Sequence, residues 1–150
     1  MKKLLFVCLA LFMAAAAFSQ SAKTTGVTDS DVQSFCKNLK KMEADFKKFD
    51  VDTSDAQAMA MALGADKSVE QILNKNGISG SNAIDKLRAI AYGYVIARYD
   101  EAMAADPEAA ALIKSMGRDP MAEARTQISD ADQIVVGRHL QELKKVFDDD

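Results

Sequence analysis

The sequence predicts an all-α fold: a compact bundle of five to seven helices that follows an N-terminal signal peptide. Three observations carry this prediction. A long apolar stretch at residues 81–105 has helical periodicity, good helix-capping residues recur along the chain, and no segment shows sustained strand alternation. The chain has 150 residues, which suits one domain once a signal peptide is removed.

Residues 1–19 have the pattern of a secretory signal peptide of bacterial style. Lys2 and Lys3 precede an apolar run over residues 4–18, and Ala17 and Ser19 offer small side chains just before Gln20. We therefore expect cleavage between Ser19 and Gln20, and a mature protein that is periplasmic or secreted. A membrane anchor is the alternative, but the run is short for a span, which needs roughly 20 residues, and polar residues follow directly.

The rest of the chain divides by composition. We expect a flexible lead-in at residues 20–27, a single helical domain at 28–147 and an acidic tail at 148–150. The formal net charge is −3, and loss of Lys2 and Lys3 would bring it to −5. This charge argues against a general nucleic-acid binder, which normally has a basic excess.

The first expected helix begins near residues 28–30, where cap residues cluster, and continues to about residue 49. Its apolar seam follows alternating spacings of three and four residues, as in helix bundles. The seam comprises Val32, Phe35, Leu39, Met42, Phe46 and Phe49. Five lysines lie off the seam and form a basic outer face, which is either simply solvated or docks on an anionic membrane or acidic partner. Short helices are expected at residues 55–63 and 67–75, the second of them ended by Asn76 and Gly77.

The central helix is expected over residues 81–105. It is apolar nearly all round, a pattern that predicts burial. Ala89, Gly93 and Ala97 form a row of small residues that would let another helix backbone approach closely. A transmembrane role is disfavoured because the run between Arg88 and Arg98 is far shorter than the roughly 20 residues of a span.

Three further helices follow. Asp106-Pro107 and Asp119-Pro120 are helix-start signals and predict helices at about 107–116 and 120–128. Ser129 or Asp130 caps a last helix that runs to about residue 147. We expect the first and last helices to pack against the central one.

Four polar residues are candidates for a ligand-binding or structural polar cluster: Arg88, Arg98, Asp132 and His139. The arginines share the broad side of the central helix that holds its apolar residues, so each needs a carboxylate partner such as Asp132 or Glu101, or must reach water. Alternatively, Arg98, a tyrosine and His139 surround a small acid.

No metal, cofactor or catalytic residue is expected. His139 and Glu142 could offer two ligands from one helix, but the chain has only one histidine, and bundle metal sites need more. The calcium-loop reading of residues 50–61 fails at its glycine and glutamate positions. Met59 and Met61 diverge on a helix, so they would not share a copper ion.

Cys36 is the one cysteine that remains after cleavage. A buried structural thiol is the main interpretation, and an intermolecular disulfide or a reactive thiol is the alternative.

These features predict a non-enzymatic interaction module of the cell envelope, with another envelope protein as its partner and an oligomeric state that the sequence does not define. The alternative is a helical bundle that binds a small anionic ligand on the Arg88/Arg98 side of the central helix. An enzyme is the third hypothesis.

Overall fold

A computed structural model describes residues 24–46, 67–117 and 119–148. These residues form seven α-helices and no strand, which confirms the predicted all-α class. The helices are α2 (Asp29–Phe46), α4 (Lys67–Lys75), α5 (Ala83–Ala105), α6 (Pro107–Ser115), α7 (Ala122–Arg125), α8 (Asp130–Arg138) and α9 (Leu140–Asp148). The expected signal peptide, the expected helix at 55–63 and the last two residues of the tail lie outside the described residues.

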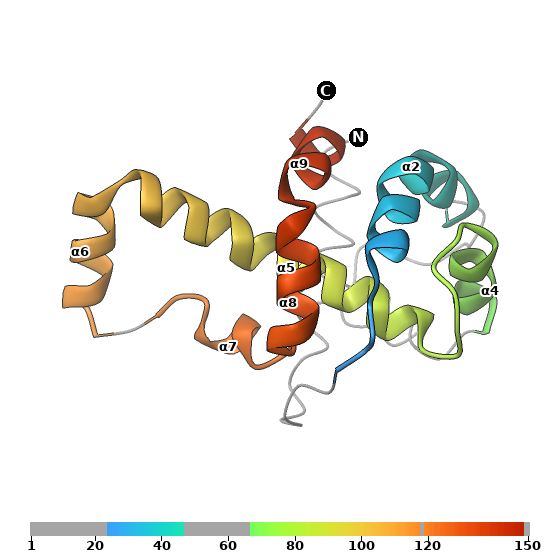
Figure 1. The fold of residues 1–150 in the computed structure, drawn as a ribbon, viewed down its shortest axis with the longest axis horizontal. Coiled ribbons are helices and arrows are strands. Elements are labelled where there is room, and N and C mark those ends of the chain that lie inside the picture. The colour runs from blue at the N-terminus through green and yellow to red at the C-terminus, as the bar shows by residue number, and fades with distance from the viewer. Residues whose placement is uncertain (1–23, 47–66, 118, 149–150) are drawn as a thin grey trace.

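The long helix α5 is the axis of the molecule (Figure 1). It contacts α4, α6, α7, α8 and α9, and α8 and α9 cross its middle. Buried residues occur on every side of its first two thirds, as the apolar pattern predicts. They are Ala83, Leu87, Ala89, Ile90, Ala91, Tyr92, Gly93, Tyr94 and Ile96.

The small-residue row of α5 accepts α8. A Cβ atom built on Gly93 would lie 2.8 Å from the Cβ of Val136 in α8 and 3.1 Å from Cδ1 of Ile128. Only a glycine leaves room for this approach, which explains why the helix tolerates glycine in its interior. The predicted close approach of another helix is therefore observed at Gly93.

The helix α2 begins with a reciprocal cap. The hydroxyl of Thr28 accepts the backbone N–H of Asp31 at 3.2 Å, and the Asp31 carboxylate accepts both the N–H and the hydroxyl of Thr28. Further along, α2 packs on α4, α8 and α9. The Phe147 ring of α9 lies 5.7 Å from that of Phe35 and 4.4 Å from that of Tyr94, so α9 links α2 to α5.

The expected last helix is divided into α8 and α9 at His139, which is a correction to the sequence-based prediction. The backbone N–H of His139 bonds to the carbonyl of Val136, three residues back, so the last turn of α8 is tightened there. Gly137 weakens the helix at this point, and the His139 ring is held by Asp29 of α2. The predicted helix at 120–128 is also shorter, since α7 spans only Ala122–Arg125.

The described part of the expected lead-in, residues 24–27, is anchored to the fold. The backbone N–H groups of Thr25 and Val27 donate to the Asp132 carboxylate, and the Thr25 carbonyl accepts from Asn82, the residue before α5, at 2.6 Å. Val27 itself is buried in the core. These contacts join the start of the described chain to α5 and α8.

Within the described ranges, no helix has the length and apolar character needed to cross a membrane.

Candidate functional site

The last third of α5 and the whole of α6 project from the bundle (Figure 1). We call residues 97–117 the arm. Beyond Ile96 no residue of α5 is buried, and none of the nine residues of α6 is buried. The arm therefore differs from the other described helices, each of which carries at least one buried residue.

Asp106 shapes the arm because it ends one helix and begins the next. Its backbone N–H bonds to the carbonyl of Ala102 in α5, and its carboxylate accepts the N–H of Ala109 in α6 at 3.0 Å. Pro107 occupies the first turn of α6, where its missing N–H is no loss. Gly117 follows α6 with a φ of 65°, a left-handed conformation that ends the helix. The predicted start signal is confirmed.

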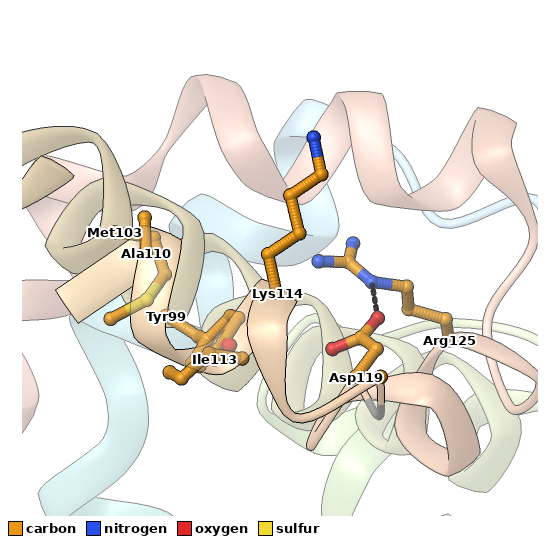
Figure 2. A pocket seen from close by; sticks show the side chains of 8 residues that line it. Tyr99, Met103, Ala110, Ile113, Lys114, Asp119 and Arg125 are labelled. Carbon is orange, nitrogen blue, oxygen red and sulfur yellow. Dashed lines mark hydrogen bonds and ion pairs between the residues drawn. The ribbon is translucent and has the colours of Figure 1, made fainter. Parts of the chain in front are cut away.

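A hollow of about 380 Å³ lies between the arm and the segment that leads into α7 (Figure 2). Its walls are mostly apolar on one side and charged on the other. The lining residues are Tyr99, Met103, Ala110, Ile113, Lys114, Gly117, Asp119 and Arg125.

The charges at the hollow largely satisfy one another. Arg125 forms ion pairs with Asp100 and with Asp119, the latter at 3.1 Å. Hydrogen bonding to Asp100 is the largest cause that raises the pKa of Arg125, so the guanidinium is held in its charged form. Because two carboxylates already face Arg125, this cation attracts a further anion only weakly.

The outer side of α6 carries an apolar stripe. Ala109, Leu112, Ile113 and Met116 follow the i, i+3, i+4, i+7 spacing of a helix face that packs against another element. Leu112 is 65% exposed and Met116 is 71% exposed, whereas Ile113 turns toward the hollow. The stripe and the hollow are thus continuous.

The two arginines that the sequence singles out form ion pairs within their own helix. Arg98 lies 3.8 Å from Glu101, which is one of the partners expected for it. Arg88 lies 3.1 Å from Asp85, and its Nε atom is buried without a hydrogen-bond partner among the described residues.

The other two candidates hold the start of the chain. Asp132 accepts the Thr25 and Val27 amides and the Ser129 hydroxyl. His139 Nε2 lies 2.8 Å from Asp29, and the pKa of Asp29 is lowered chiefly by this hydrogen bond. The contacts of Asp132 and His139 therefore involve residues 25–29, whereas those of Arg88 and Arg98 given above lie along α5.

An ion pair that sequence reasoning missed lies at the start of α2. The Nζ atom of Lys86 is 3.1 Å from Asp31, and their side chains are only 13% and 5% exposed. Lys86 also donates to the carbonyl of Ser79 at 2.8 Å. The Thr28-x-x-Asp31 spacing was a readable capping signal, but nothing local in the sequence indicates that Lys86 is the partner of Asp31.

Cys36 lies on α2, where it is half-buried against the core, and its thiol is free. Burial is the main cause that raises its pKa to about 11, and the nearby charge of Glu142 adds to it. The thiol is therefore protonated at neutral pH and is a poor nucleophile.

In the described parts of the chain, no group of three or more His, Cys, Asp or Glu side chains is placed to hold a metal ion. Residues 50–61, which include Met59 and Met61, lie outside those parts.

Comparisons with protein-family models, with curated proteins and with solved structures gave no significant match to this chain.

Proposed function

We propose that the protein is an exported, non-enzymatic interaction module of the cell envelope, and that the arm is its contact surface. The observation that carries the proposal is that α6 buries none of its residues and yet has the apolar spacing of a packed helix. Isolated helices shorter than about 12–15 residues are marginal in water, and α6 has nine residues. A partner that covers Leu112 and Met116 would supply the missing packing.

Cysteine and histidine are common catalytic residues, and the surroundings of Cys36 and His139 support a role without catalysis. The Cys36 thiol is kept protonated by its surroundings, and the His139 ring is 8% exposed and engaged with Asp29. Both groups serve the packing of α2 against α8 and α9.

The composition of residues 1–19 supports export to the periplasm or beyond the cell. Mass determination of the protein recovered from the envelope or the medium tests this part, since the chain should begin at Gln20. An Ala17→Lys variant should be retained uncleaved, because a charge at that position blocks small-residue recognition. A wild-type product that still begins at Met1 would contradict export by this route.

The contact surface is tested by crosslinking in cells that express the tagged full chain. Wild type should form a defined crosslinked product, and Leu112→Asp with Met116→Asp should remove it. Ile134→Asp is the matched control, because Ile134 is 63% exposed on α8, away from the arm. A Cys36→Ser variant that keeps the product excludes a disulfide link. Equal products from all variants would overturn the proposed surface.

A second candidate function is the binding of a small anion on the Arg88/Arg98 side of α5. The buried Arg88 Nε atom, which lacks a hydrogen-bond partner among the described residues, favours it. A screen of small carboxylates by thermal shift, with Arg88→Ala and Arg98→Ala as comparisons, tests this candidate. A ligand that stabilises wild type and both variants equally would argue against it.

A further inference from the structure

We propose that the arm of one copy docks on α2 of a second copy of this chain, so that the protein associates head to tail. This inference rests on the proposed function, because it names the partner of the arm. The docking partner is the outward face of α2 that carries Lys37, Lys40 and Lys41, which we call the lysine face.

The lysine face is a concentrated cation patch on an acidic protein. Gln33, Lys37, Lys40, Lys41 and Ala44 are all exposed and fall within one narrow wedge of the α2 helical wheel. The residues buried by α2, such as Val32, Phe35 and Leu39, occupy the opposite side. Among the described residues, none of the three lysines forms an ion pair. Their charges are thus available to a partner.

The arm has the complementary character. Asp106 and Glu108 of the arm are exposed beside the apolar stripe, whereas Lys114 is the one exposed cation there, in the described residues, that no carboxylate engages. Carboxylates of the arm can therefore meet the ammonium groups of the lysine face. The aliphatic stems of the lysines, together with Ala44, give Leu112 and Met116 an apolar floor to cover.

The positions of the two surfaces decide the geometry of association. The arm lies at one end of the long axis of the molecule, and α2 with α4 lies at the other (Figure 1). One copy therefore cannot place its own arm on its own lysine face. Contacts between unlike surfaces repeat from copy to copy, so association continues beyond the dimer unless the rotation closes a ring.

The charge balance at the hollow argues against a small anion as the occupant. Arg125 is already engaged by Asp100 and Asp119, so the hollow has little surplus positive charge. The lysine face fits better as the partner, because its apolar part can cover the stripe and its ammonium groups can pair with the exposed carboxylates of the arm.

The test uses sedimentation velocity of the purified chain over a wide concentration range. Wild type should form species larger than a dimer as concentration rises, and moderate salt should weaken them because the contact is exposed and charged. Leu112→Asp with Met116→Asp should weaken association on the order of 30-fold, as expected for the loss of central interface side chains. Ile134→Asp, with its similar exposure on α8, should behave as wild type.

Charge reversal gives a sharper test. A lysine-face variant (Lys37→Glu, Lys40→Glu, Lys41→Glu) and an arm variant (Glu108→Lys) should each associate far more weakly than wild type when alone, and their equimolar mixture should associate again. Only contact between these two surfaces predicts that recovery. Lys145→Glu, an exposed reversal on α9, is the control and should not alter association. Circular dichroism checks that each variant keeps its helix content.

Three outcomes would overturn the inference: a chain that stays monomeric at every concentration, association that ignores the lysine-face reversal, or a mixture that does not recover. The proposed function fails separately. If the chain is monomeric but the cellular crosslink still depends on Leu112 and Met116, the arm is the contact surface and its partner is a different protein.

Discussion

Gly93 of α5 faces Val136 of α8 at a separation that leaves no room for a larger residue than glycine at position 93. An added Cβ at Gly93 would lie 2.8 Å from both Cβ and Cγ1 of Val136. Because Val136 is fully buried, its branched side chain has nowhere to move. The fit of this pair fixes how far α8 can stand from the central helix.

We predict that Gly93→Ala destabilises the protein despite the better helix propensity of alanine. Overpacking costs about 1–3 kcal/mol, and the propensity gain of up to about 1 kcal/mol offsets only part of it. Urea unfolding measures the difference. Gly137→Ala is the matched control, since its added Cβ meets nothing within 4 Å, and this variant should be slightly stabilised. Adding Val136→Ala to Gly93→Ala should recover stability; a double variant as unstable as the two single costs combined would contradict the contact.

The Asp31–Lys86 pair should be costly to break from one side. Lys86→Met leaves the buried Asp31 carboxylate without its cation, and the free energy of unfolding should fall by about 3 kcal/mol. Asp31→Asn combined with Lys86→Met should lose less than the sum of the two single changes, because neither charge is then unpaired. Equilibrium urea unfolding of wild type, Asp31→Asn, Lys86→Met and the double variant completes this double-mutant cycle. Strict additivity would show that the two side chains do not interact.

Acid should unfold the protein partly through Asp31. Burial opposes ionisation of this carboxyl, but hydrogen bonds from Thr28 and Lys86 outweigh it, so the pKa of Asp31 is lowered in the folded protein. Its stabilising contribution is therefore present above the unfolded-state pKa of about 3.9 and is lost as the pH falls through the lower folded-state pKa. Asp31→Asn should be less stable than wild type at pH 7, and the two unfolding curves should converge as the pH approaches 3. A constant difference over that range would argue against this linkage.

Cys36 should react slowly with thiol reagents. With a pKa of about 11, its thiolate fraction at pH 7.5 is small, and labelling should be roughly 100-fold slower than for a free thiol. Labelling followed by absorbance gives the rate, and the same protein in denaturing urea gives the unprotected reference. Rapid labelling of the folded protein would show that the thiol is exposed to reagent and solvent.

Local signals in the sequence predicted the helices well. Thr28, Asp106 and Ser129 each lie at a helix start and accept backbone N–H groups there, as their side chains indicate. Gly93 also correctly predicted a close contact with another helix. These features depend on residues within a few positions of one another, so a single sequence contains them.

The candidate site could not be predicted from the sequence. It exists because no other described helix buries the arm, and local patterns do not reveal which helices pack together. Tyr99 and Met103 continue the apolar pattern of α5, so this pattern does not indicate that the buried part of the helix ends before them. Which helix covers which face is decided by contacts between distant segments. The pairing of Lys86 with Asp31, and the break at His139, are further cases in which a long-range partner overrides the local pattern.

The anchoring of Thr25 and Val27 on Asp132 has a consequence for the order in which the fold can be completed. These hydrogen bonds join positions 107 and 105 residues apart. During synthesis, the amides of Thr25 and Val27 cannot form these hydrogen bonds until Asp132 has been made, more than 100 residues later. The same contact means that α8 holds the N-terminal segment in place, so a chain that ends before α8 lacks the carboxylate that binds residues 25 and 27.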